Sequence, residues 1–440
     1  TGRSGEMVSI FTNGQILPKK VVVSGLGEKD ELLLKDFRSQ IAKFAKSLNK
    51  KINSVSLGLI SDIKFSQPEQ AQMIAEGFLL GDYRYSQYVK KEKSDKILEM
   101  ILVSGVTEKE KKSVLASFEF GHLIFQATKL ARDLVNEPAV SATPTMLSKV
   151  AQDIAKSSPL ITVKVFDKAQ AQKMGMGAFL GVAQGADTPP KFVHLQYTPT
   201  SSKNKRKLAV IGKAITFDTG GVSLKPEKYM TDMKMDMAGA AAVLGLFSVI
   251  TTLKPDFEVM GLFAATPNMV SGSSYLPGDI LRAMNGKTIE IMNTDAEGRV
   301  TLADSISYAL KEGATEIIDL ATLTGAAMVA LGTDYAALYG NDEKFKGEVV
   351  DSYKKSGEKF WEMPLPKEYA EHNKSEVADI SNLPASFWAG SITAALFLEE
   401  FVDEKPWVHV DIAGPAYAEK NHDLGPKGGT GFGVSSLIYL

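Results

Sequence analysis

Three short segments of this 440-residue chain place acidic side chains directly after apolar, strand-like runs. Asp218 ends the first segment, Asp236 ends the second, and Asp295 and Glu297 lie in the third. Four carboxylates gathered in one partly buried cleft would carry a prohibitive free-energy cost unless cations compensated their charge. Two divalent cations supply the four missing positive charges, and oxygen ligands suit Mg²⁺, Mn²⁺ or Zn²⁺. These residue types therefore predict a hydrolytic site with two metal ions.

Each acidic residue also has a simpler interpretation. Asp218 fits a turn before a Gly-Gly pair, and Asp236 fits a helix N-cap. Asp295 and Glu297 fit a turn and the first turn of a following helix, where the helix dipole favours negative charge. If the segment is extended instead, residues two apart face the same way, so Asp295, Glu297 and Arg299 point into one cleft. The metal hypothesis rests on the four acids occurring together.

Two lysines flank Asp218, with Lys213 five residues before it and Lys225 seven residues after it. A lysine binds a metal only as a neutral amine, which requires its pKa to be lowered by the metal and by desolvation. A protonated lysine near the cleft stabilises a developing oxyanion instead. Salt bridges with the same acids are the simpler alternative for both lysines. The residues alone leave these roles open.

The elements that must position these residues follow an α/β order. The second part of the chain alternates apolar β-type runs with helical stretches, which indicates a largely parallel sheet with helices on both faces. Such sheets bind ligands beyond the carboxyl ends of their strands. The expected strands are 207–211, 259–264, 288–291, 316–320 and 408–412, and the expected helices include 237–250 and 300–310.

The first part predicts a small α/β domain, with strands at 20–24, 54–60 and 97–103 and helices at 30–48, 68–80 and 108–134. Thr143-Pro144 supplies an N-cap followed by proline at the first helical position. We therefore divide the chain into an N-terminal α/β domain, 1–132, and a catalytic domain, 133–440. Residues 1–6 are a candidate cloning remnant before a native start at Met7.

Composition narrows the classes of function. The 50 Lys and Arg balance 52 Asp and Glu, so no global field attracts nucleic acid or an anionic membrane. Cysteine is absent, which excludes thiolate nucleophiles and Cys-ligated metals, and the five dispersed histidines form no His-Glu-x-x-His helix. The apolar run 239–253 is shorter than a membrane span and predicts a buried helix. No secretion signal is visible, so we expect a cytoplasmic protein without membrane or nucleic-acid partners.

The segment Asn293-Thr294-Asp295-Ala296-Glu297-Gly298-Arg299 resembles the signature of the leucyl aminopeptidase (M17, cytosol aminopeptidase) family. Further matching stretches cover essentially all of residues 130–440, whereas the N-terminal part is shorter than usual and resembles the family only in its α/β order. The chain departs from the family at Ala416, where some relatives carry a bulkier residue, and at 382–388, where relatives are richer in glycine. The matching stretches are 135–138, 215–221, 233–239, 277–279, 319–325 and 411–414.

The resemblance implies a role for each candidate residue. Asp218 and Glu297 would bridge two metal ions. Asp295 would complete the ligand set of one metal, and Lys213 and Asp236 would complete that of the other. The expected ions are Mn²⁺ or Zn²⁺, and Mg²⁺ is a further candidate. Lys225 would stabilise the tetrahedral intermediate, and Arg299 would hold a bicarbonate ion that acts as general base toward metal-bound water. The pocket for the first side chain would be lined by mostly small or apolar residues that favour Leu or Met: Met233, Thr322, Gly325, Ala413 and Ala416.

The family also implies peptide substrates with a free N-terminus and a homohexamer built as a dimer of trimers. Two rival functions remain at this stage. A two-metal phosphoesterase would use the same carboxylates, and a non-catalytic or DNA-binding protein would keep the fold and lose one or more metal ligands. All of the family's ligand positions are retained in this chain.

Overall fold

The computed structural model describes residues 2–48, 52, 54–90, 100–201, 204–384 and 386–440. It consists of two compact units. The first comprises 1–129 and 419–427, and the second comprises 130–418 and 428–440. The sequence placed 419–427 in the catalytic domain, but in the structure this segment belongs to the first unit. Lys43 there forms an ion pair with Asp423 at 3.2 Å, and Lys46 donates to the Gly425 carbonyl at 3.2 Å.

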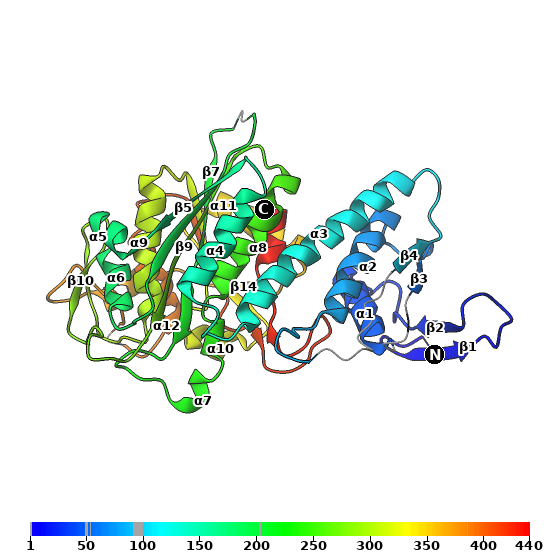
Figure 1. Cartoon of the computed structure of the whole chain (residues 1–440), viewed down its shortest axis with the longest axis horizontal. Coiled ribbons are helices and arrows are strands. Elements are labelled where there is room, and N and C mark those ends of the chain that lie inside the picture. Colours follow the sequence, from blue (N-terminus) through cyan, green and yellow to red (C-terminus); the bar gives the residue numbers. More distant parts are fainter. Residues whose placement is uncertain (1, 49–51, 53, 91–99, 202–203, 385) are drawn as a thin grey trace. The chain divides into compact units, whose positions relative to one another are not determined.

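The first unit has the α/β order expected from the sequence (Figure 1). Strands β3 and β4 pair in parallel, and helices α1 and α2 pack against each other over a core that includes Phe37, Ile74 and Phe78. Strands β1 and β2 form an antiparallel hairpin, of which the sequence predicted β2 but not β1. The start of the expected strand 97–103 lies outside the described residues. The elements are β1 Met7–Phe11, β2 Lys20–Ser24, α1 Leu34–Ser47, β3 Ser54–Gly58, α2 Gln67–Asp82, β4 Met100–Ser104 and α3 Lys111–Asn136, of which the residues from 130 onward belong to the second unit.

The second unit is built on a nine-stranded mixed sheet in the order β14-β13-β16-β12-β7-β9-β6-β5, with β8 also paired to β9. Its centre, β16-β12-β7-β9, is parallel as predicted, and antiparallel pairing occurs on both sides of that centre. The strands are β5 Ile161–Phe166, β6 Lys191–Tyr197, β7 Lys207–Gly212, β8 Ala214–Asp218, β9 Glu258–Asn268, β12 Glu316–Ala321, β13 Ala336–Gly340, β14 Phe360–Glu362 and β16 Trp407–Asp411.

Helices cover both faces of this sheet (Figure 1). One group consists of α4 Pro144–Lys156, α8 Ala238–Leu253, α11 Glu343–Ser356 and α13 Val434–Tyr439. The other consists of α6 Gly177–Ala183, α9 Glu297–Lys311 and α12 Gly390–Glu399. The remaining elements are α5 Lys168–Lys173, α7 Glu227–Met230, η1 Met233–Met235, β10 Ile280–Arg282, β11 Thr288–Glu290, α10 Gly325–Leu331, η2 Lys367–Asn373, β15 Ile380–Ser381, β17 Tyr417–Ala418 and β18 Gly428–Gly429.

Local sequence signals explain two of these helices. The Thr143 hydroxyl accepts a hydrogen bond from the Met146 N–H at 3.2 Å, and Pro144 occupies the first position of α4, as the sequence predicts. Helix α8 is almost entirely buried, as expected for its run of small and apolar residues. By length and composition the helical stretch Glu227–Leu253 could span a membrane, but 78% of its apolar window is buried inside the structure.

Candidate active site

The acidic residues predicted to share a site do come together. Asp218 ends β8, Asp236 follows η1, and Glu297 is the first residue of α9. One carboxylate oxygen from each of the three lies within 4.8 Å of the others, and all three side chains are buried. The end of β8, the turn after η1 and the start of α9 meet here, so residues up to about 80 positions apart in the sequence become neighbours.

Lys213 joins two of these acids. It directly follows β7, and its Nζ lies 2.8 Å from Asp236 Oδ2 and 2.9 Å from Glu297 Oε1. The same ammonium donates to the Thr322 carbonyl at 2.9 Å. Burial disfavours the charged form of this lysine, but the carboxylates of Asp236, Glu297 and Asp218 outweigh burial and raise its pKa.

Lys225 brings the fourth acid to the site. Its Nζ lies 2.9 Å from Asp218 Oδ2 and forms a second ion pair with Asp295 Oδ1. Burial opposes its charge, but Asp218, Glu297 and Asp295 together raise its pKa. Both lysines thus form the salt bridges that the sequence left as one alternative, and Asp295 connects to the three-acid group through Lys225.

Two ammonium groups do not balance four carboxylates. Burial, with Asp218 as the next contribution, raises the pKa of Glu297 to about 8, and burial raises the pKa of Asp236 to about 6. Among the described residues, Glu297 Oε2 has no hydrogen-bond partner although it is buried. A buried carboxylate oxygen without a donor, in a cluster short of positive charge, fits coordination of a divalent cation.

Arg299 lies in the first turn of α9 and is buried. Within the described part of the chain, its Nε and Nη1 have no hydrogen-bond partner. Burial lowers its pKa to about 10, opposed by the charges of Glu297 and Asp411. Two unpartnered donors on a buried guanidinium fit a small anion.

The local conformation at the signature segment corrects one interpretation. An extended segment, one of the two conformations left open, would point Asp295, Glu297 and Arg299 the same way. Helix α9 begins at Glu297, so the other conformation, with acids at a helix start, is the observed one. For Asp236 the N-cap alternative is wrong, because the N-cap position of α8 is Met237. The Asp236 carboxylate instead pairs with Lys213.

Two supporting residues were missed by the sequence analysis. Asn268, the last residue of β9, donates to Asp218 Oδ1 at 2.9 Å and to the Thr294 carbonyl at 3.0 Å, and so orients one acid against the signature segment. Asp411, the last residue of β16, accepts from the N–H groups of Leu323 and Ala413, both at 3.1 Å. A polar residue after a buried strand was the available signal in both cases.

The residues predicted to line the side-chain pocket differ in how they relate to the acidic cluster. The Thr322 hydroxyl donates to Asp236 Oδ1 at 2.5 Å, which ties it to the acidic cluster. Gly325 begins α10, and a side chain there would meet open space. Met233 begins η1, the turn directly before Asp236. Ala413 and Ala416 are buried in the turn after β16, and their role beside a substrate stays a prediction.

Backbone packing sets the spacing of the cluster. A Cβ on Gly239 would lie 2.1 Å from the Leu320 carbonyl oxygen and 2.7 Å from the Lys213 nitrogen, and one on Gly212 would lie 2.3 Å from the Gly239 carbonyl carbon. The start of α8 therefore contacts β7 and β12 through main-chain atoms. This contact holds Asp236 beside Lys213.

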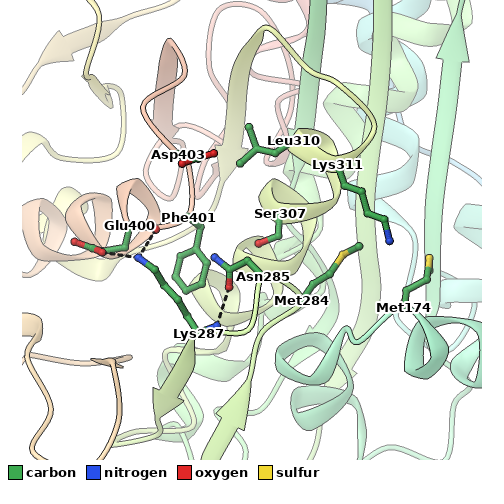
Figure 2. A pocket seen from close by; sticks show the side chains of 10 residues that line it. All are labelled: Met174, Met284, Asn285, Lys287, Ser307, Leu310, Lys311, Glu400, Phe401 and Asp403. Carbon is green, nitrogen blue, oxygen red and sulfur yellow. Dashed lines mark hydrogen bonds and ion pairs between the residues drawn. The ribbon is translucent and has the colours of Figure 1, made fainter.

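A separate cavity of about 490 Å³ lies at the opposite end of α9 (Figure 2). Ser307, Leu310 and Lys311 from that helix line it, together with the turn before β11 and the end of α12. Its Lys287 is neutralised by Glu400, whose carboxylate and carbonyl both accept from the ammonium at 2.8 Å. This cavity lacks the grouped carboxylates of the site at the start of α9.

A mixed α/β unit with a buried cluster of carboxylates and lysines beside the ends of β7 and β8 fits the class of hydrolases. The chain belongs to the cytosol aminopeptidase family: the model of the family's catalytic domain matches residues 129–438, and that of its N-terminal domain matches residues 1–93. It is therefore a peptidase.

Individual relatives agree with this assignment. The chain is 42% identical to the probable cytosol aminopeptidases of Persephonella marina and of a Picosynechococcus strain; the first match covers 99% of this chain and 88% of the relative, and the second 100% and 88%. Among solved structures, the bottromycin maturation enzyme BotP in complex with Mn has a TM-score of 0.91 at 33% identity, covering 100% of this chain and 93% of that one. A mutant tomato leucine aminopeptidase has a TM-score of 0.89 at 37% identity, covering 100% and 84%.

Proposed function

We propose that this protein is an aminopeptidase that removes N-terminal residues, preferably Leu, Met or other apolar residues, from peptides by using two divalent metal ions. The observation that carries the proposal is the charge imbalance of the site, where Lys213 and Lys225 face four carboxylates and Glu297 keeps an unpartnered buried oxygen. The manganese complex of BotP, a protein of the same fold, supports a divalent cation.

The residues that would hold the two cations are the acids of the cluster and one lysine: Lys213, Asp218, Asp236, Asp295 and Glu297. When bound, such cations lower the pKa of water and stabilise negative charge on a substrate carbonyl oxygen. Mn²⁺ and Zn²⁺ are the expected ions, with Mg²⁺ as a further candidate, because the donor set is mainly carboxylate oxygen. Lys213 binds a metal only after losing a proton, so metal binding must reverse the raised pKa that it has beside its carboxylates.

Lys225 has a different task in the proposal. It is less buried than Lys213, and its ammonium is kept protonated by Asp218 and Asp295. A protonated donor at the edge of the cluster suits stabilisation of the oxyanion that forms when water adds to the scissile carbonyl. Arg299, with two free donors, would hold a bicarbonate ion that accepts the proton from the attacking water.

The first side chain of the substrate would lie against Met233, Thr322, Gly325, Ala413 and Ala416, which are apolar or small apart from the threonine hydroxyl already bonded to Asp236. Such a lining favours Leu and Met. We further propose a cytoplasmic homohexamer that acts on peptides with a free N-terminus, as the names of the relatives and the family resemblance suggest.

One set of assays tests the proposal. Purified protein is incubated with leucyl-anilide, N-acetyl-leucyl-anilide and an aryl phosphate, before and after chelation and re-addition of Mn²⁺, Zn²⁺ or Mg²⁺. We expect turnover of the free-amine anilide alone, loss of that turnover on chelation, and two metal ions per chain by elemental analysis. Hydrolysis of the phosphate instead, or full activity in the chelated protein, would overturn the proposal.

A further inference from the structure

Four large apolar side chains next to the site are left exposed. Val329 and Phe387 are each 90% exposed, Trp388 is 77% exposed and Met292 is 51% exposed. Phe387 and Trp388 contact each other edge to face, with ring centroids 5.5 Å apart. We call these four residues the apolar rim. Exposed aromatic clusters of this kind mark binding surfaces, because hydrating them costs free energy that a partner recovers.

The segment that carries the two rings is attached to the catalytic signature at its beginning. Asn382 donates from Nδ2 to the Asn293 carbonyl at 2.7 Å, and its Oδ1 accepts from the Met292 N–H at 2.8 Å. A buried asparagine that pairs with two consecutive residues fixes the segment against the strand end that leads into Asp295. Met292 of the apolar rim lies at this attachment.

The end of the segment is attached to the other side of the site. Ala389 adopts a left-handed conformation with φ 58° at the N-cap of α12, and a Cβ on Gly390 would lie 3.3 Å from the Ala326 Cβ of α10. Helix α10 begins at Gly325, a residue of the proposed side-chain pocket. Val329 lies one turn beyond Ala326, on the same side of that helix. The apolar rim therefore connects the acidic segment to the pocket wall.

We propose that the apolar rim binds the part of the peptide that follows the scissile bond, and that Phe387 and Trp388 determine a preference for apolar residues there. This inference rests on the proposed aminopeptidase function. Once the first residue is held at the cluster, the next two residues extend at most about 7 Å from it, so they must cross the elements that border the site. The segment that carries Phe387 and Trp388 is attached to two of these bordering elements, the signature segment after β11 and helix α10.

The test compares substrates that differ only after the first residue. Wild-type protein, the double variant Phe387→Ala/Trp388→Ala and the control Trp361→Ala are assayed with Leu-Gly-Gly, Leu-Phe-Gly and leucyl-anilide. Trp361 is a matched control because it is also an exposed tryptophan but lies on β14, at the edge of the sheet. All three aromatic side chains are exposed in the structure, so we expect both variants to fold, and the unfolding temperature checks this.

We expect the wild-type protein and Trp361→Ala to cleave Leu-Phe-Gly with a kcat/KM about tenfold above that for Leu-Gly-Gly, the discrimination typical of one apolar contact region. The double variant should lose this ratio, because its kcat/KM for Leu-Phe-Gly should fall about tenfold further than its kcat/KM for Leu-Gly-Gly. A wild-type ratio near one, or a ratio that survives in the double variant, would overturn the proposal.

Two further outcomes are also decisive. An equal loss on all three substrates would show that the rings hold the segment in place without selecting the substrate, and would overturn the proposal. A change in molecular mass by light scattering, with the substrate ratio kept, would show that a second copy of the chain covers the apolar rim, and would also overturn the proposal. Failure of the wild-type protein to cleave any of the peptides would instead contradict the proposed function itself.

Discussion

Each unit of the molecule buries charged side chains, but the two groups differ in their balance. In the first unit, Arg38 Nη1 lies 2.9 Å from Glu76 Oε2, and Gln72 donates to the other oxygen of that carboxylate at 2.7 Å. One cation meets one anion, and both carboxylate oxygens have donors. In the second unit, two lysines meet four carboxylates, and a buried oxygen of Glu297 has no donor among the described residues.

The difference separates a structural ion pair from a binding site. A balanced buried pair needs nothing further, because each charge compensates the desolvation of the other. In the unbalanced group a carboxylate pKa is raised, and that of Glu297 is about 8. The excess negative charge of this group is neutralised only when a cation binds. Charge balance, more than burial, is therefore the property that identifies the site.

The largest expected effect follows from removing an acid of the unbalanced group. Asp295→Ala and Glu297→Ala should each lower kcat at least about 10³-fold, because each variant loses a ligand and with it bound metal. Elemental analysis of the purified variants should show the loss of metal directly. Glu343→Ala, which removes an exposed acid of the same unit, is the control and should retain both activity and metal. Undiminished activity in both acid variants would remove the basis of the mechanism.

Removal of each lysine should separate their roles. Lys225→Ala should lower kcat by about 10²–10³, the usual result of losing one oxyanion donor, while metal content stays normal. Lys213→Ala should lower metal content as well, since this lysine lies between Asp236 and Glu297. The neighbouring exposed Lys228→Ala controls for loss of charge in the same loop. A normal metal content in Lys213→Ala, or a reduced one in Lys225→Ala, would reverse the two assignments.

A smaller effect is expected at Arg299. Arg299→Ala should lower kcat about 10–100-fold, as expected for a residue that holds an auxiliary general base. In bicarbonate-free buffer, the wild-type rate should fall and recover when bicarbonate is added back, whereas the variant should not respond. A variant that responds to bicarbonate as the wild-type protein does would exclude anion binding by its two unpartnered donors.

The balanced pair should affect stability and leave catalysis unchanged. Arg38→Ala leaves Glu76 buried without its cation and should destabilise the first unit by about 3–5 kcal/mol in denaturant unfolding. Lys29→Ala breaks the exposed pair with Asp62 and should cost at most about 1 kcal/mol. Both variants should keep the wild-type kcat under folding conditions. A loss of kcat in folded Arg38→Ala would show that charge balance does not separate the two groups.

The sequence predicted the centre of the catalytic unit well because its buried parallel strands are continuous apolar runs. Of the four acids, Asp218 ends a strand of this sheet, whereas Asp236 follows η1 and Asp295 and Glu297 lie at the start of α9. Strands β5, β6 and β13 were not predicted, and β5 alternates buried and more exposed residues where a continuous apolar run was expected. The roles of Lys213 and Lys225 could not be separated, because they depend on which carboxylates each ammonium reaches in space. The joining of 419–427 to the first unit depends on contacts with Lys43 and Lys46, nearly 380 positions away, which leave no local pattern.

The contact of α8 with β7 and β12 through Gly212 and Gly239 has a consequence for variation in this protein. Where the main chain of a helix contacts the main chain of a strand, no side chain can change its rotamer to accommodate a larger residue, so the distance between the two elements is fixed. The hydrophobic interior can thus exchange one aliphatic residue for another over evolutionary time without altering how far Asp236 stands from Lys213. Mutational tolerance should fall sharply at these two glycines, where even an added methyl group would force the helix away from the strands.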